Sequence, residues 1–489
     1  MRTIDFGNPQ SDAAYLIGGF SGPRGPRRHI GQVAKMRLFL PEGRANKLTL
    51  NTRYDREQEL ELLLNDAPIG TASVKGTKQT EPFAFEIAGD VAKAENVLEL
   101  RCSRPHPLDA HQPRCLELES LVVEQWDEPE MPEPEAPECG LYFGDIHVHS
   151  NLSPCNRPNN GTLDENYEWA REDGWDFIAI ADHDTFMSDD MWRESLEACE
   201  KYNDPGRFAT IFAYEWTSFF FGQMNVYSPS PDVPLHRCTD FATHSPPKLW
   251  AALRESGVPA FTVYHHMAAP GWLTTWDYND PEMLPLIEIY SIWRSSETAR
   301  GYSRKLRKKL AGCTAQDALA RGFRVGFIGG GDTHNYRPGT KGIAAVYATD
   351  CTREAIWKAL KAKRCYATTG AKIELDVTIA GVGMGKEITF TPYTQDVLFP
   401  ARVLVTVKGT APIRSIEVIE NGDVIYAQDE HFGQHEALLD FRIENLARAY
   451  NTSALSNPSR SYYVRVTQHD GHMAWSSPIY FVRDWSGVE

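Results

Sequence analysis

The chain lacks long apolar runs, paired cysteines and an excess of basic residues. No run approaches the roughly 18 apolar residues of a membrane span, and the first ten residues include Asp5, Gly7 and Pro9 where a secretion signal needs an unbroken apolar core. Its nine cysteines include no C-x-x-C pair, which is typical of free thiols in a reducing compartment. A formal net charge of −16 argues against a broad nucleic-acid surface. The sequence therefore predicts a soluble, cytoplasmic protein without a membrane or nucleic-acid partner.

The 489 residues exceed what one hydrophobic core usually organises, so several domains are expected. Strand-like alternation in segments such as Lys47–Leu50 predicts an N-terminal β-sandwich over residues 1–126. An acidic, proline-rich stretch over residues 127–139 cannot form a core and is expected to be an extended linker. Alternation returns in segments such as Val403–Val407, which predicts an Ig-like C-terminal β-sandwich over residues 373–489.

Between these segments, residues 140–372 alternate short apolar runs with helical patterns, which predicts βα units around a largely parallel sheet. Thr162–Glu165 has the pattern of a capping box that opens a helix. In α/β barrels, functional side chains gather at the carboxyl ends of the strands. Five apolar runs end in residues that can bind a metal, which are His147 and His149, then Asp182, His183 and Asp184, then Glu215, then His265 and His266, and finally Asp332 and His334 after three glycines.

These residue types at strand ends favour a metal site. Side chains alternate along a strand, so His147 and His149 face the same side and can chelate one ion. The two oxygens of Glu215 can bridge two cations, and Gly329–Gly331 let the backbone approach the site closely. Any one of these histidines, taken alone, is more often a hydrogen-bonded structural residue, and the glycines do not form a P-loop. Together the imidazoles and carboxylates predict two or three divalent transition-metal ions (Zn, Mn or Fe).

In order and spacing, these motifs resemble those of the polymerase and histidinol phosphatase (PHP) superfamily. The segments Tyr214–Thr217, Ile287–Ser291, Cys365–Gly370 and Ala474–Pro478 are similar to its carbaryl-hydrolase (CehA/McbA) branch. The resemblance implies a distorted seven-stranded, TIM-like α/β barrel with up to three metals. It implies three ligand sets, which are His147, His149, Glu215 and Asp332 for one ion, Glu215 with His265 or His266 for a second, and His183 with His334 for a third.

Two positions depart from the family pattern. Where many relatives carry a histidine or aspartate shortly after the H-x-H motif, this chain has Pro154 and Cys155, which makes Cys155 a candidate thiolate ligand of the third ion. Where the closer branch carries a histidine before Asn225-Val226, this chain has Gln223, so the second ion would lack that imidazole.

The leading functional prediction is hydrolysis of an ester-type bond in a small molecule, with phosphoesters first, by a metal-activated hydroxide. Asp332 and Glu215 are the predicted catalytic carboxylates. Three arginines near predicted strand ends, Arg157, Arg294 and Arg337, are candidates to bind a developing negative charge. Arg337 is favoured because its loop is short and follows the predicted ligand pair directly.

Two alternatives remain open. Aromatic residues near the motifs, such as Trp216, Phe219, Trp272 and Trp293, also suit carbamate or carboxylic esters of aromatic alcohols, although such residues equally well pack a core. A catalytically inert carbohydrate-binding protein is the second alternative, and the many retained ligands argue against it. The flanking sandwiches are expected to supply no metal ligand and to frame the site entrance or a homo-oligomer contact.

Overall fold

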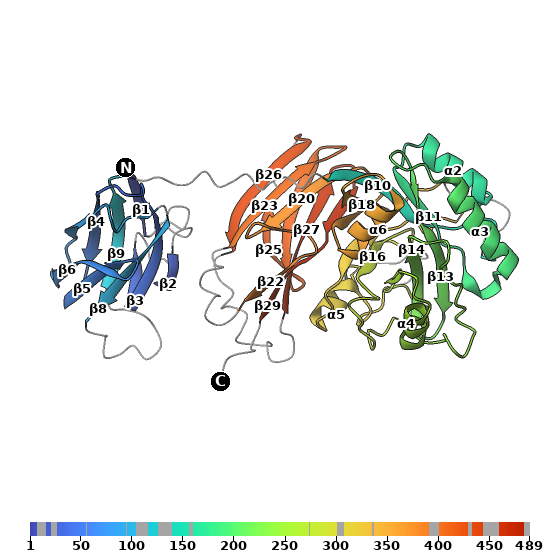
Figure 1. Ribbon diagram of the computed structural model, residues 1–489, viewed down its shortest axis with the longest axis horizontal. Coiled ribbons are helices and arrows are strands. Elements are labelled where there is room, and N and C mark those ends of the chain that lie inside the picture. Colours follow the sequence, from blue (N-terminus) through green and yellow to red (C-terminus); the bar gives the residue numbers. More distant parts are fainter. Residues whose placement is uncertain are drawn as a thin grey trace. The chain divides into compact units, whose positions relative to one another are not determined.

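A computed structural model describes the chain in fourteen stretches (Figure 1), which are residues 1–6, 16–20, 27–54, 56–93, 95–103, 116–125, 139–155, 160–272, 274–300, 308–334, 337–390, 401–428, 433–443 and 459–483. It divides into two compact units, the first made mainly of residues up to 135 and the second mainly of residues from 136 onward. The predicted linker lies, apart from Cys139, outside the described residues, as does Arg157. The domain boundaries given above stay predictions.

The first unit is built from strands whose side chains alternate between core and solvent. Each second residue of Asn46–Arg53 is buried, as the period-two pattern predicts. Leucines from several strands, among them Leu50, Leu62 and Leu98, have no exposed surface and form one core. The nine strands are β1 (Arg2–Asp5), β2 (Leu16–Phe20), β3 (Arg28–Phe39), β4 (Asn46–Arg53), β5 (Glu57–Leu64), β6 (Ala67–Lys75), β7 (Glu81–Ile87), β8 (Glu95–Cys102) and β9 (Leu116–Val123). All their recorded pairings are antiparallel, which confirms a sandwich-like β unit.

The second unit contains two sheets whose strands carry the motifs. One has the order β13 (Phe212–Ser218), β14 (Gly222–Ser228), β15 (Phe261–Tyr264), β16 (Leu286–Tyr290) and β17 (Gly326–Gly329). The other begins with β12 (Ala209–Thr210), β11 (Phe177–Ile180), β10 (Gly140–Val148), β18 (Ile343–Ala348) and β19 (Cys365–Thr368). Isolated parallel bridges, His183 to Glu215 and Val148 to Thr333, join the two sheets. The ends of β10, β11 and β17 therefore lie close to the centre of β13.

Strand directions in this unit differ from the largely parallel sheet predicted above. β10 pairs parallel with β11, and β15 and β17 pair parallel with β16. In contrast, β14 is antiparallel to β13, to which a tight hairpin joins it, and it is also antiparallel to β15. β18 is antiparallel to β10. The sheets are therefore mixed. These pairings do not show a closed TIM-like barrel, and the seven-stranded barrel stays a prediction.

Five α-helices occur among the described residues, so strands predominate there. They are α2 (Leu163–Glu172), α3 (Asp189–Tyr202), α4 (Pro246–Glu255), α5 (Ala315–Ala320) and α6 (Arg353–Lys361), and a 3-10 turn, η1 (Asp184–Phe186), follows β11. The capping box predicted before α2 is confirmed, because Thr162 and Glu165 each accept a hydrogen bond from the other's backbone N–H. In the part of the chain that the model describes, every helix is too short or too polar to cross a bilayer.

The C-terminal strands form two further pieces of sheet. One is a separate four-stranded sheet of β20 (Glu374–Ile379), β21 (Val382–Gly383), β23 (Ala401–Lys408) and β26 (Glu436–Ile443). The others extend the sheet that contains β10, and they are β22 (Glu387–Phe390), β24 (Ile413–Glu420), β25 (Asp423–Gln428), β27 (Ser459–Gln468), β28 (Met473–Ser476) and β29 (Ile479–Arg483). Because β28 pairs with β19, one eleven-stranded sheet runs from the strands of the motifs into the C-terminal segment.

The buried carboxylate of Glu297 connects this C-terminal segment to the part of the chain that carries the motifs, through hydrogen bonds and an ion pair. Glu297, only 5% exposed, accepts hydrogen bonds from the Tyr463 hydroxyl at 2.7 Å and from Trp475 Nε1 at 2.9 Å, and it pairs with Arg465 at 2.8 Å. The indole of Trp475 also stacks on Tyr290, at the end of β16, with ring centroids 5.8 Å apart. The C-terminal strands thus pack against the end of β16, one of the strands that carry the motifs.

Candidate metal centre

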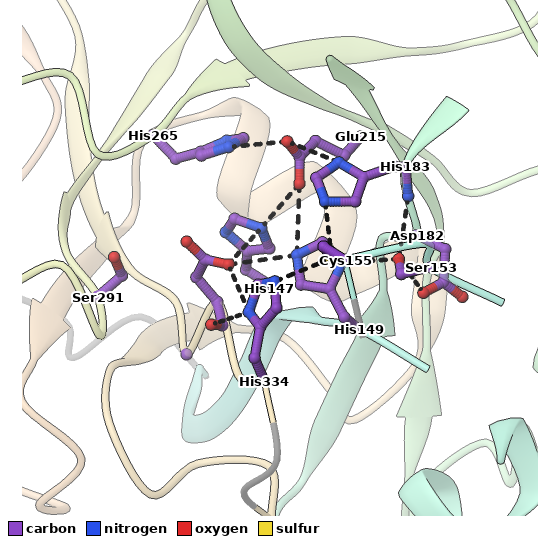
Figure 2. A network of polar contacts seen from close by, with 12 residues as sticks. His147, His149, Ser153, Cys155, Asp182, His183, Glu215, His265, Ser291 and His334 are labelled. Atoms are coloured by element: carbon purple, nitrogen blue, oxygen red, sulfur yellow. Dashed lines mark hydrogen bonds and ion pairs between the residues drawn. The ribbon is translucent and has the colours of Figure 1, made fainter. Parts of the chain in front are cut away.

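Three overlapping groups of ligand-type side chains lie where the strand ends meet (Figure 2). Within each group, one ligand atom per residue lies within 4.8 Å of all the others. The groups are His147, Glu215 and His265; His147, His149 and Asp332; and His149, Cys155, His183 and His334. His147 and His149 are each shared by two groups, and they lie at the end of β10 and directly after it. Among the described residues, all members of these groups lie between positions 147 and 334.

Glu215 occupies the middle of the cluster, at the centre of β13. Its Oε1 lies 3.2 Å from Nδ1 of His183 and 3.4 Å from Nε2 of His265. Its Oε2 lies 3.3 Å from Nε2 of His149 and 3.5 Å from Nε2 of His147. With 1% of its surface exposed, this carboxylate faces four imidazoles and almost no water. This is the arrangement needed for a carboxylate that bridges two cations.

Asp332 closes the cluster from the loop after β17. Its Oδ1 lies 3.2 Å from Nε2 of His149 and 3.8 Å from Nε2 of His147. The residue has a φ of 46°, in the left-handed region, and its backbone N–H donates to the carbonyl of His147 at 2.7 Å. A residue with a Cβ rarely adopts this conformation, and such strain is often found at functional sites.

The donor atoms of the cluster fit a cation. Several buried donor atoms have no hydrogen-bond partner among the described residues, and they are Nε2 of His147, Nε2 of His149, Oε1 of Glu215 and both ring nitrogens of His265. Buried polar atoms without partners are costly, so several in one place indicate a missing ligand. Burial and the nearby His334 lower the pKa of His149 to about 3, which leaves its imidazole neutral and able to bind a metal. The described residues thus suit divalent ions bound by nitrogen and oxygen.

Two buried carboxylates, Glu288 and Asp145, contact residues of the cluster and of its loops, and neither was predicted from the sequence. Oε2 of Glu288, in β16, lies 2.8 Å from Nδ1 of His147 and so directs Nε2 of that ring into the cluster. Asp145, two residues before His147, accepts hydrogen bonds from the N–H groups of Gly331 and Gly339, both at 2.8 Å. Burial raises the pKa of Asp145 to about 6, although these N–H groups oppose the shift.

The sequence contained signals for both residues. Glu288 is a charged residue inside the apolar run Leu286–Tyr290, and Asp145 continues the period-two pattern of His147 and His149 backwards along β10. The close approach predicted for the three glycines is also present. A Cβ on Gly330 would collide with the carboxylate of Glu288, and one on Gly331 would collide with Asp145.

Asp182, predicted as a metal ligand, is in none of the three groups. Its oxygens accept hydrogen bonds from the Ser150 backbone N–H at 2.7 Å and from the hydroxyls of Ser150 and Ser153, each at 2.6 Å. The Ser153 hydroxyl in turn contacts Nδ1 of His149 at 2.9 Å. Asp182 thus contacts His149 through Ser153, and its role as a metal ligand stays a prediction.

The model distinguishes the two neighbouring histidines after β15. His265 belongs to a group with Glu215, whereas His266 belongs to none. His266 adopts a φ of 33°, and its ring packs against the rings of Trp272 at 5.6 Å and Trp293 at 5.4 Å. This grouping favours His265, beside Glu215 and His147, as the ligand of the second predicted set, and that assignment stays a prediction.

Comparisons with known proteins give one family match. Residues 177–266 and 330–391 match the model of a family described as a protein of unknown function, DUF3604. Together these stretches make up roughly a third of the chain, and they include His183, Glu215, His265, Asp332 and His334. The match thus covers part of the cluster, without His147 and His149.

Curated relatives that match this chain include chlamydial proteins. An uncharacterized protein of Chlamydia pneumoniae is 27% identical over 328 residues, which cover 60% of this chain and 50% of that protein. An uncharacterized protein of Chlamydia muridarum is 33% identical over 218 residues, which cover 40% of this chain and 34% of that protein. The chain thus spans half or less of the length of these two relatives.

The solved structures are more distant. A two-domain protein from Bacteroides vulgatus, containing a predicted PHP-like metal-dependent phosphoesterase, is 14% identical with a TM-score of 0.35, and the match covers 70% of this chain and 96% of that one. A family 35 carbohydrate-binding module from an environmental isolate is 13% identical with a TM-score of 0.18, over 25% of this chain and 92% of that one. The narrower carbaryl-hydrolase resemblance stays a prediction.

The structure separates the two described candidate arginines. Arg337 forms ion pairs with Glu172 at 2.8 Å and Asp173 at 2.9 Å, at the end of α2, and its guanidinium lies over the ring of Trp169. These contacts do not support the predicted role of Arg337 at the substrate. Arg294 is exposed, has a φ of 69°, and has no ion-pair partner within the described part of the chain.

Arg294 is therefore the better candidate to contact a substrate. Arg294 lies in a turn that is bonded to the residue before Asp332, because the Ile292 N–H donates to the carbonyl of Gly331 at 3.1 Å. We expect Arg294→Ala to lower kcat by about 10²-fold, by analogy with the loss of an oxyanion donor. Arg337→Ala is the matched control and should leave kcat unchanged, since exposed ion pairs contribute little. Steady-state kinetics at equal metal content checks both, and the reverse ranking would restore the original prediction.

Glu288→Gln tests how the cluster is positioned. The amide keeps the size of the side chain but weakens its contact with Nδ1 of His147. Groups that orient a ligand in this way typically contribute about 10- to 100-fold to metal affinity. We expect a loss of that size in competition titrations with a chelator, without a change in the midpoint of thermal unfolding of the metal-free protein. Unchanged metal affinity would show that Glu288 is only a structural residue.

Proposed function

We propose that this chain is a metal-dependent hydrolase that cleaves an ester-type bond, with phosphoesters as the first substrate class. The observation that carries the proposal is the set of three overlapping ligand groups, linked by His147 and His149, of which the two that contain a carboxylate are buried throughout. One tetrahedral ion needs four ligands, so these groups provide for two or three ions. Zn, Mn and Fe are the ions that suit mixed imidazole and carboxylate ligands.

Each residue has a distinct task in this proposal. Bound divalent ions would supply Lewis-acid chemistry, which lowers the pKa of water and stabilises negative charge on the substrate. Glu215 and Asp332 hold the ions close together and balance their charge. Glu288 keeps the proton on Nδ1 of His147, so that Nε2 stays a ligand. The exclusion of water around Glu215 strengthens every electrostatic interaction in the cluster.

Phosphoesters come first because the motifs resemble those of the PHP superfamily. The exposed guanidinium of Arg294 supports the choice, since it is a planar, permanently charged donor for phosphate oxygens. A positively charged metal cluster beside such a residue suits a substrate that carries negative charge before the reaction begins.

A chain of aromatic contacts favours the alternative, a carbamate or carboxylic ester of an aromatic alcohol. Phe219 is 58% exposed and lies 5.1 Å from the ring of Trp272. Trp272 in turn lies 5.6 Å from His266, whose ring is 4.4 Å from that of the candidate ligand His265. This series of rings leads from solvent to the cluster and offers flat apolar surface to an aromatic leaving group.

Metal reconstitution combined with a substrate screen tests the proposal. The metal-stripped full chain is loaded with Zn²⁺, Mn²⁺ or Fe²⁺ and assayed with p-nitrophenyl phosphate, bis-p-nitrophenyl phosphate, p-nitrophenyl acetate and an aryl carbamate. We expect hydrolysis of a phosphoester only after loading, and none by Asp332→Asn. Preference for the carbamate would favour the alternative. Full activity without metal, or in Asp332→Asn, would overturn the proposal.

A further inference from the structure

One of the three ligand groups contains a thiol and no carboxylate. In this group Sγ of Cys155 lies 3.1 Å from Nε2 of His183 and 3.0 Å from Nε2 of His334. Nε2 of His149 completes it, within the common limit of 4.8 Å. The other two groups each contain a carboxylate, so this one differs from them in the chemistry of its donors.

Two imidazoles of the group, those of His183 and His334, turn Nε2 toward the thiol. In each of the three rings Nδ1 is held by an oxygen, which leaves Nε2 to face the group. The three contacts are His149 with Ser153 Oγ at 2.9 Å, His183 with Thr217 Oγ1 at 2.8 Å, and His334 with the carbonyl of Asp332 at 2.9 Å.

The proton on Nδ1 can be assigned from these partners. A carbonyl oxygen only accepts, so His334 donates from Nδ1 to Asp332, and in the neutral ring, the form that binds a metal, Nε2 carries a lone pair. The Ser153 hydroxyl donates to Asp182 at 2.6 Å, so it accepts from Nδ1 of His149. Both rings are therefore held in the tautomer that binds a metal through Nε2.

The third ring follows the same rule. The Thr217 hydroxyl donates to the carbonyl of Glu215 at 3.1 Å, so it accepts from Nδ1 of His183. Three Nε2 lone pairs thus converge, while the Cys155 thiol has one proton to offer. Nε2 of His149, in a residue only 1% exposed, has no hydrogen-bond partner among the described residues, and its nearest polar neighbours are carboxylate oxygens, which only accept. One thiol proton cannot satisfy three acceptors, whereas one cation can.

We infer that His149, Cys155, His183 and His334 form a thiolate–imidazole position that selects a thiophilic divalent ion such as Zn²⁺ over Mg²⁺ or Mn²⁺. A sulfur ligand favours softer ions, and oxygen ligands favour Mg²⁺ and Mn²⁺. Binding releases the thiol proton to solvent and leaves Cys155 as the only anionic donor of the group. This inference rests on the proposed function and deepens it, because it makes the ions of the centre chemically unequal.

Cobalt substitution reads out the sulfur ligand directly. Metal-stripped full chain is titrated with Co²⁺ and followed by absorption, since a thiolate bound to Co²⁺ gives a charge-transfer band in the near ultraviolet. We expect the band in the wild type and its loss in Cys155→Ser, together with about one fewer bound Zn²⁺ per chain. Cys155→Asp should restore the ion count without the band and should shift the preference toward Mn²⁺.

Two controls sharpen the test. Cys238→Ser changes a different thiol of the same unit, which is partly buried, donates to the carbonyl of Thr217 and belongs to none of the groups, so the band should remain. Iodoacetamide labelling of the wild type gives a second measurement. Zn²⁺ should protect the exposed Cys155 from alkylation, whereas Mg²⁺ should not.

The outcomes separate this inference from the proposed function. Absence of the band from cobalt-loaded wild type, or its survival in Cys155→Ser, would overturn the inference even if phosphoesters are hydrolysed. A band that depends on Cys155 would sustain the inference even if no ester in the screen is cleaved, in which case only the proposed hydrolase activity fails.

Discussion

His147→Ala should reduce ester hydrolysis by about 10³-fold or more, because the metal-assisted chemistry that it removes is worth several kcal/mol of transition-state stabilisation. His147 belongs to two of the three groups, so its loss weakens two metal positions at once. The side chain is fully buried, yet its removal also relieves the crowding of several imidazoles. The fold should therefore survive, as far-ultraviolet circular dichroism would show.

A matched control keeps this result interpretable. His236 is a partly buried histidine of the same unit and is in none of the groups, so His236→Ala should keep both activity and metal content. Metal analysis of the His147 variant should find fewer ions per chain than in the wild type. If the variant turns over substrate at the wild-type rate, the cluster is not the catalytic centre.

Glu297→Ala should have the largest effect on stability. It leaves Arg465, whose side chain is 20% exposed, without one of its two carboxylate partners, and it leaves the Tyr463 hydroxyl and Trp475 Nε1 without an acceptor. Breaking a buried ion pair from one side typically costs about 3 to 5 kcal/mol. Urea unfolding followed by tryptophan fluorescence should show a midpoint shift of corresponding size.

The exposed pair of Glu374 and Lys408, 3.2 Å apart, is the comparison for that experiment. Both side chains are about half exposed, so Glu374→Ala should move the midpoint far less. Equal shifts for the two variants would mean that Glu297 does not fasten the C-terminal strands to the rest of the unit.

Much of the candidate site could be predicted because its residues follow local patterns. His147 and His149 share a strand face, and Glu215 and Asp332 each follow an apolar run, so their convergence required only that strand ends meet. Which of His265 and His266 points inward could not be predicted, because it depends on the positive φ of His266 and on the packing of two tryptophans.

The rest depended on contacts between distant parts of the chain. Arg337 meets Glu172 only because α2 packs beside its loop, more than 160 residues away in sequence. The antiparallel pairing of β14 depends on where the hairpin lies in the finished sheet, which alternation of apolar residues does not encode. The strands themselves were predictable from their local periodicity, and their directions were not.

The pairing of β19 with β28 also affects the order in which the chain can fold during its synthesis. β28 leaves the ribosome roughly a hundred residues after β19, which is a delay on the order of five to twenty seconds at typical rates of translation. Until then β19 has an unpaired edge, and edge strands of this kind readily pair with other chains. The newly made chain thus passes through an interval in which chaperone binding would favour its correct assembly.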